Sequence, residues 1–347
     1  MREHAGADPE GLRQLLRRTL VDTGLLREAM SGLPAGPRVA VKTTFMMGYD
    51  RRDPSPHVDL TLARELAVLL REHGATDVAF LEAPNHYDWY FGGRSVAQVA
   101  TYLGFTDQSY RIVDVSLDQT PHHFSRGIAQ STISGTWKQA DLRLSFAKMR
   151  SHPSWLCHLS LNTLETLGRR IDELLFLDRQ ADLLSGLMMV FDGFPPHLAV
   201  LDATHHVPDG LTGVLGDPTP CHPGRLYAAK DPIALDFVAS RHMGLPRFPR
   251  DSTLMLASDW FEDPRPWTTV DGTDAPISSF KSPHRNDATV LLSAMAYPVY
   301  SWGGDRGSWW LPLMDPVAFP MLHRETVVQA IVRRGLRALF GFGRPAR

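Results

Sequence analysis

An amphipathic helix followed at once by a buried strand constrains this fold more than any other feature of the sequence. Residues 58–73 carry apolar side chains at helical spacing, and Gly74 ends the helix. The apolar face consists of Leu60, Ala63, Leu66, Ala67 and Leu70. The strand "RVAVKTTF" precedes this helix and the strand "DVAFLEAP" follows it. Because a strand–helix–strand unit joins parallel strands, the segment predicts a parallel sheet.

The same alternation recurs along the chain. "SVAQVATYLGF" is typical of a helix, whereas "YRIVDVS", "ADLRLSFAKM", "HLAVLDAT" and "RLYAAKD" are typical of strands. "PIALDFVASRHMG" predicts a helix with Pro232 in its first turn, and the stretch from Ser160 to Met189 is expected to be helical. The predicted fold class is α/β, with a mostly parallel sheet, helices on both faces and a less regular C-terminal extension.

The pattern divides the chain into three parts. Residues 1–36 form an N-terminal helical segment, residues 37–245 form the α/β core, and residues 246–347 form an irregular extension rich in Trp and Pro. This extension ends in a basic amphipathic helix within residues 323–347. We expect that helix to pack on the domain or on a partner subunit, as in a homodimer, and association with a membrane surface is the alternative.

Composition and charge exclude several classes of protein. A formal net charge of -2 gives no reason to expect nucleic acid as a partner. Two cysteines cannot build a disulfide framework or a thiolate metal cluster. We see no secretory signal at the N-terminus and no apolar run long enough for a membrane span, so we expect a cytoplasmic protein.

Titratable side chains follow four of the predicted strands. Ligands of parallel α/β sheets bind at the carboxyl ends of the strands, so these residues are the candidates for a site. The four strand ends provide Lys42 with Arg51 and Arg52, Glu82 with His86, Lys148 with Arg150 and His152, and Asp202 with His205. The cations predict a cleft that binds an anionic group. Asn162, in the block "LNTLETLG", completes the candidate substrate-binding set.

Two histidines are candidates for proton transfer, because the imidazole group titrates near neutral pH. His86 and His152 each follow a strand, and two imidazoles facing one ligand can act as base and acid. A divalent metal held by His86, His152 and Glu82 or Asp202 is an alternative. His57 and Asp59 have the spacing of a facial iron triad, but they stand where a helix begins, so Asp59 is interpreted as a residue of its first turn. We find no standard cofactor motif and predict no cofactor.

Several segments resemble a known family in their order and spacing. They are "AVKTTF", "ELAVLLREHGATDVAFLEAP", "ADLRLSFAKMRSH", "LNTLETLG", "LAVLDAT", "GLTGVLGDP" and "AAKDPIALDFVASRHMG". Together they resemble the family labelled domain of unknown function 362, over about residues 38–245. The chemistry of that family is poorly described, and the iron–sulfur motifs that some relatives append have no counterpart here.

A weaker similarity links the chain to the N-terminal domain of nickel-pincer lactate racemases. It rests on "RDPSPH", "LEAPNH" and "ADLRLSFAKMRSH". The likeness implies that His86 and His152 are the proton-transferring pair and that Arg51 or Arg52 binds a substrate carboxylate. The racemase lysine that carries the cofactor has no match, because Leu161 and Asn162 occupy its place. We therefore do not expect a bound nickel pincer.

These observations favour a small-molecule enzyme of specialised metabolism that transfers a proton at carbon without a cofactor, as isomerases, epimerases, cyclases and lyases do. His86, His152 and Lys148 are the expected catalytic residues. The expected residues for binding an acidic substrate are Lys42, Arg51, Arg52, Glu82, Arg150, Asn162 and His205. A metal-dependent enzyme using the same histidines and a non-catalytic binding protein are the alternatives.

Overall fold

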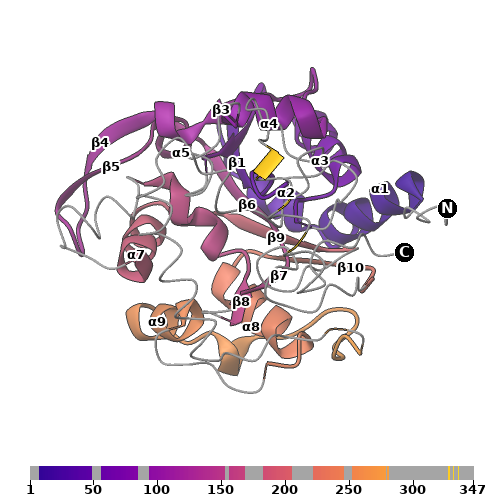
Figure 1. The fold of residues 1–347 in the computed structure, drawn as a ribbon. Coiled ribbons are helices and arrows are strands. Elements are labelled where there is room, and N and C mark those ends of the chain that lie inside the picture. The colour runs from indigo at the N-terminus through magenta and orange to yellow at the C-terminus, as the bar shows by residue number, and fades with distance from the viewer. Residues whose placement is uncertain are drawn as a thin grey trace.

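A six-stranded sheet forms the centre of the protein, for which we describe a computed structural model (Figure 1). The structure describes residues 8–48, 56–84, 94–152, 156–168, 183–204, 222–245, 252–278 and 280, with 327, 328, 331 and 335. The strand order is β10-β9-β6-β1-β2-β3. The bounds are β1 Arg38–Thr43, β2 Asp77–Glu82, β3 Arg111–Asp114, β6 Leu142–Lys148, β9 Leu198–Ala203 and β10 Arg225–Ala229.

Neighbouring strands of this sheet run parallel, except that the edge strand β10 runs antiparallel to β9. Helices cover both faces. One face packs against α1 Pro9–Arg17, η1 Arg18–Asp22, α2 Leu25–Met30, α3 Leu60–Glu72 and α4 Val96–Leu103. The other packs against α5 Gly135–Gln139, η4 Asn162–Leu167, α7 Leu183–Gly193, α8 Pro232–His242 and α9 Thr253–Trp260. The predicted α/β fold, mostly parallel with helices on both faces, is confirmed.

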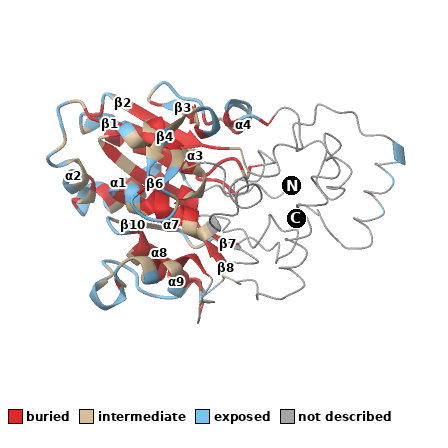
Figure 2. Cartoon of the chain, turned by 90° about the vertical axis from the view of Figure 1, so that its left-hand side faces the viewer, coloured by how far each residue is buried: buried red, intermediate tan, exposed pale blue. Residues whose placement is uncertain are grey.

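Strand alternation divides the apolar core into two clusters. Leu144 and Phe146 of β6 belong to the cluster beneath α3 and α4, whereas Ala147 belongs to the cluster beneath α7 and α8. Successive side chains of a strand point to opposite faces, so a central strand with apolar residues on both faces must be covered on both sides. Figure 2 shows the central strands as buried and the exposed residues on the surrounding helices and loops.

Two hairpins were not predicted from the sequence. β4 Gln119–His123 pairs with β5 Gln130–Ser134, and β7 Arg150–His152 pairs with β8 Leu156–His158. The stretch from Ser160 to Met189 is helical in part: Asn162–Leu167 forms the 3-10 helix η4, α7 begins at Leu183, and residues 169–182 lie outside the described part. These segments are too short, or too poor in alternating apolar residues, for a periodic pattern to identify them.

The helical ends of the chain match the sequence only in part. The N-terminal segment is helical as expected, although it divides at Gly24 into α1 with η1 and then α2. In the predicted irregular extension, α9 is a regular helix and η6 Arg265–Trp267 is a short 3-10 turn. Val327, Val328 and Ile331 of the expected last helix are exposed. None of the described helices has the length and apolar character that a membrane crossing needs.

Polar side chains define where the core helices begin. Asp59 accepts hydrogen bonds from the backbone N–H groups of Thr61 and Leu62 at the start of α3. Asp231 caps α8 in the same way, with Pro232 directly after it. Ser95 and Gln98 form a reciprocal capping box at the start of α4. The sequence predicted that Asp59 lies in the first turn of this helix. The structure places it one residue earlier, as the N-cap.

The capping box of α4 gives a first prediction. Ser95→Ala removes the hydroxyl that accepts from the Gln98 N–H, so the free energy of unfolding should fall by about 1 kcal/mol. Thr101→Ala on the same helix is the control, because that hydroxyl only donates to the carbonyl of Ala97, which the helix already uses. Urea unfolding of both variants measures the difference. Equal losses would show that the capping box contributes nothing specific.

Candidate active site

Buried charged side chains lie at the carboxyl ends of four neighbouring strands. In the order β9, β6, β1, β2 they are Asp202, Lys148, Lys42 and Glu82, and each is at most 5% exposed. We call these four residues the charged edge. The Lys42 ammonium lies 2.6 Å from Glu82 Oε1, and the Lys148 ammonium lies 3.1 Å from Asp202 Oδ2. Each buried cation therefore has a buried carboxylate on the adjacent strand, as the cost of burying a charge requires.

The two lysines leave the sheet on opposite faces. Lys42 comes two residues after Ala40 on β1, so both point to the same face. Ala40 belongs to the cluster beneath α7 and α8. Lys148 comes two residues after Phe146 on β6, so both point to the same face. Phe146 belongs to the cluster beneath α3. Lys42 pairs in register with Ser145, so Lys148 lies three residues, or about 10 Å, further along the sheet. The structure thus separates two cations that the sequence assigned to one cleft.

Glu82 fixes the turn that follows β1. Its Oε2 accepts a hydrogen bond from the backbone N–H of Phe45 at 2.8 Å and a longer one from Met46 at 3.4 Å. Arg94, itself 3% exposed, donates to the carbonyl oxygens of Met46 and Gly48 in the same turn. These hydrogen bonds fix the backbone of the turn after β1, just before residues 49–55.

Asp202 fixes the start of α3 relative to β9, as Glu82 fixes the turn after β1. Its Oδ2 accepts from the backbone N–H of Asp59 at 2.8 Å, next to the Lys148 ammonium. Its Oδ1 accepts from the N–H and the hydroxyl of Thr204. A carboxylate with several donors and a cation is satisfied even though it is 0% exposed. The pair Lys148–Asp202 thereby joins β6, β9 and the start of α3.

A second group of charged residues surrounds His158 on β8. Arg150, its register partner on β7, places Nη2 3.2 Å from His158 Nδ1. Glu165 of η4 places Oε1 3.7 Å from His158 Nε2. Burial lowers the pKa of His158, the charges of Arg150 and Lys42 lower it further, and Glu165 opposes them. We call His158, Arg150 and Glu165 the His158 cluster, and it holds a neutral imidazole at neutral pH.

The turn from β8 into η4 is held by a buried carboxylate. Asp236 on α8 accepts from the Ser160 N–H at 3.0 Å, from the Ser160 hydroxyl at 2.6 Å and from the Leu161 N–H at 2.9 Å. Burial raises the pKa of Asp236 to about 7, although these donors favour its charged form. The Ser160 carbonyl in turn accepts from the Ser145 hydroxyl of β6. Asp236 therefore positions the residues on either side of this turn.

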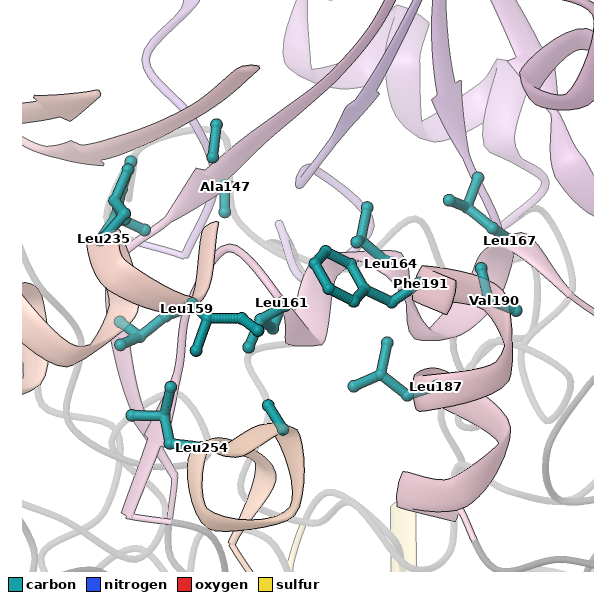
Figure 3. Close-up of a cluster of buried hydrophobic side chains, with 14 of the residues drawn as sticks. Ala147, Leu159, Leu161, Leu164, Leu167, Leu187, Val190, Phe191, Leu235 and Leu254 are labelled. Carbon is teal, nitrogen blue, oxygen red and sulfur yellow. The ribbon is translucent and has the colours of Figure 1, made fainter. Parts of the chain in front are cut away.

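Apolar packing supports the same turn (Figure 3). Leu159, Leu161 and Leu164 lie among side chains of the helices around them, and all three are fully buried. Their neighbours in the figure are Ala147, Leu167, Leu187, Val190, Phe191, Leu235 and Leu254. Because α7, α8 and α9 all contribute to this cluster, the polar residues between the leucines are held in place.

The residues predicted from the sequence are distributed unevenly over the structure. Lys42, Glu82 and Lys148 lie at the charged edge, Arg150 lies in the His158 cluster, and Asn162 donates to the Thr253 hydroxyl of α9 at 2.8 Å. Those that lie outside the described residues are Arg51, Arg52, His86 and His205. His152 is the last residue of β7, opposite Leu156, and its side chain also lies outside the described part. The convergence of His86 and His152 therefore stays a prediction.

Three functional candidates were missed from the sequence. His158 of β8 and Glu165 of η4 lie against each other, and Asp236 of α8 holds the turn between them. His158 and Glu165 lie on two different short elements, so their contact depends on the turn at Ser160 and not on a periodic pattern. Asp236 stands in the "DPIALD" block that carried the family resemblance, and this was the only signal available. Within the described part of the chain, no three His, Cys, Asp or Glu side chains are grouped as metal ligands would be.

The buried ion pair predicts a large and specific loss of stability. Lys148→Met leaves the Asp202 carboxylate buried without a counter-charge, so we expect the free energy of unfolding to fall by about 3–5 kcal/mol. Lys230→Met is the matched control, since Lys230 pairs with Glu28 on the surface and both side chains are more than half exposed. Its effect should be much smaller. Similar losses for the two variants in urea unfolding would show that burial of the pair is energetically unimportant.

Asp236 gives a second prediction about this site. Asp236→Asn replaces one acceptor oxygen by an NH2 group that faces a backbone N–H, so we expect a loss of about 1–3 kcal/mol and faster amide exchange at Ser160 and Leu161. Asp231→Asn in the same helix is the control, because asparagine caps a helix as well as aspartate does. Unchanged exchange at Ser160 and Leu161 would contradict the positioning role.

Comparisons with known proteins identify the family to which the chain belongs. No curated protein matches the chain. A lactate racemase apoprotein from Thermoanaerobacterium thermosaccharolyticum is 12% identical with a TM-score of 0.36, covering 57% of this chain and 49% of that one. A structural genomics target from Thermotoga maritima is 10% identical with a TM-score of 0.30, covering 56% and 50%. The chain spans about half the length of these structures, and no site residue is transferred from either.

The family comparison covers the part of the chain that holds both groups of charged residues. Residues 39–241 match the family described as domain of unknown function (DUF362), which confirms the resemblance over about residues 38–245. The match begins in β1 and ends in α8, so it includes the charged edge, the His158 cluster and Asp236. Because it spans more than half of the sequence, the chain belongs to the DUF362 family.

Proposed function

We propose that this protein is an enzyme that transfers a proton at a carbon atom of a small acidic substrate bound at the carboxyl end of its sheet. The observation that carries the proposal is the charged edge. Buried ion pairs are often neutral or unfavourable for stability compared with apolar residues of the same size. Two such pairs on four adjacent strands, at the end of the sheet where α/β proteins bind ligands, therefore favour a functional role.

The segments that follow the charged edge carry the residues with the proposed chemical roles. The turn held by Glu82 and Arg94 leads to Arg51 and Arg52, which we assign to the substrate's anionic group. Glu82 also ends the strand that precedes His86, and Lys148 ends the strand that precedes β7 and His152. His86 and His152 are the proposed base and acid. Active sites fix their reacting groups by placing them next to rigid strand ends.

Lys148 has an electrostatic role in this proposal. Its side chain is 1% exposed and its ammonium is paired with Asp202, so it cannot reach a substrate without breaking that pair. A buried fixed charge stabilises developing negative charge through a medium of low dielectric constant. Lys42, paired with Glu82, lies on the face of η4, where its charge acts on His158.

Solvent deuterium incorporation tests the proposed function before the substrate is known. A metabolite extract in D2O with wild-type protein should contain a small acidic compound that gains deuterium at carbon, detected by mass spectrometry. His86→Ala and His152→Ala should each slow this incorporation 10²-fold or more, because each removes a proton-transferring group. His123→Ala, an exposed histidine on β4, is the control and should incorporate normally.

The opposite results separate the alternatives. If wild-type protein retains a metabolite without labelling it, the protein binds without turnover. If both histidine variants label as fast as wild type, the assignment of base and acid is wrong. If labelling stops on chelation and returns with a divalent ion, the enzyme depends on a metal.

A further inference from the structure

The orientation of His158 is defined by its neighbours. Arg150 is a donor only, so the 3.2 Å contact from its Nη2 requires His158 Nδ1 to be an acceptor. The ring proton is therefore assigned to Nε2, which faces Glu165 Oε1 at 3.7 Å. With a carboxylate behind Nε2, the Nδ1 lone pair can accept a proton once the Arg150 guanidinium no longer donates to it.

The surroundings also keep this imidazole in its base form. The charged groups that face it are Arg150 from β7, Glu165 from η4 and Lys42 from β1. His158 is 8% exposed, and its burial and the two cations disfavour a positive charge on the ring. Only Glu165 opposes them. A neutral histidine beside two cations accepts a proton more readily when negative charge arrives nearby.

We propose that His158 is a further catalytic base of the site and that Arg150 controls it, uncovering Nδ1 when the guanidinium turns to a carboxylate of the substrate. The inference rests on the proposed function in placing an acidic substrate at this end of the sheet. It narrows the substrate class to carboxylates with an acidic C–H bond on the adjoining carbon. A charged carboxylate is a stronger partner for a guanidinium than a neutral imidazole nitrogen, which provides the driving force.

The proton transfer that follows is balanced without a cofactor. The C–H bond next to the carboxylate breaks, the proton moves to His158 Nδ1, and the electron pair passes into the carboxylate to give an enediolate. The imidazolium that forms faces Glu165 through its Nε2–H, and Arg150 stays beside the new negative charge. Return of the proton from His158 to carbon restores the neutral base. Where another acid of the site protonates the carbon instead, His158 passes its proton to solvent.

Histidine NMR with malonate as the probe tests this inference on the full-length protein. In 15N-labelled wild type, His158, assigned by loss of its signals in His158→Gln, should carry its proton on Nε2 and should titrate below the usual histidine range. Malonate should shift its Nδ1 resonance saturably and raise its pKa, because the guanidinium turns away. Chloride at the same ionic strength is the control and should cause no such shift.

Arg150→Gln and Glu165→Gln provide the matched variants. Without the Arg150 cation, the pKa of His158 should rise and malonate should no longer affect Nδ1. Glu165→Gln should instead lower that pKa further and leave the malonate response in place. If Arg150→Gln does not fold, the wild-type titration still decides. A proton on Nδ1, no response to malonate in wild type, or an equal response in folded Arg150→Gln would each overturn the inference.

The outcome is distinguishable from failure of the proposed function. His86→Ala and His152→Ala test that function by deuterium incorporation, and neither should remove the malonate response of His158. Full incorporation by those variants with a normal His158 response would overturn only the proposed pair. If His86→Ala and His152→Ala lose deuterium incorporation as expected, but His158 does not respond to malonate, only the inference about His158 is overturned.

Discussion

The pairing of buried lysines with buried carboxylates across parallel strands is the constraint on which the rest of the structure depends. Parallel pairing aligns the carboxyl ends of β9, β6, β1 and β2, so residues far apart in the sequence come together there. Lys148 and Asp202 are register partners separated by 54 positions. Neither charge could be buried alone, and each pair must therefore form together with the sheet.

Each carboxylate of these pairs also organises a connecting segment. Glu82 orders the turn after β1 through backbone N–H groups, and Asp202 holds the start of α3 through the N–H of Asp59. Asp236 on α8 has a similar role, because it holds the turn between His158 and η4. Buried carboxyl groups thus determine where three connections leave the regular elements. That precision is what a site assembled from several loops requires.

The sequence predicted the sheet well and the site incompletely, for physical reasons. Strands such as Leu142–Lys148 have apolar residues on both faces, so their apolar pattern identified them. The rule that ligands bind at carboxyl ends then led to Lys42, Glu82 and Lys148. It did not reveal that Lys42 and Lys148 face opposite sides, because the register between β1 and β6 is not a local property of either strand.

The His158 cluster was missed because its geometry comes from short irregular elements. β7 and β8 have three residues each, and η4 is a single 3-10 segment held by Asp236 and the leucines around it. No periodic pattern marks such a turn, whereas the buried contacts that define it come from α7, α8 and α9.

A crystal structure with the deuterium-labelled metabolite bound is the most direct test of the account. It predicts the labelled carbon beyond the ends of β1 and β6, within hydrogen-bond reach of an imidazole and close to an arginine that holds the carboxylate. A ligand bound at the opposite, amino end of the sheet, or against the edge strands β3 or β10, would contradict it.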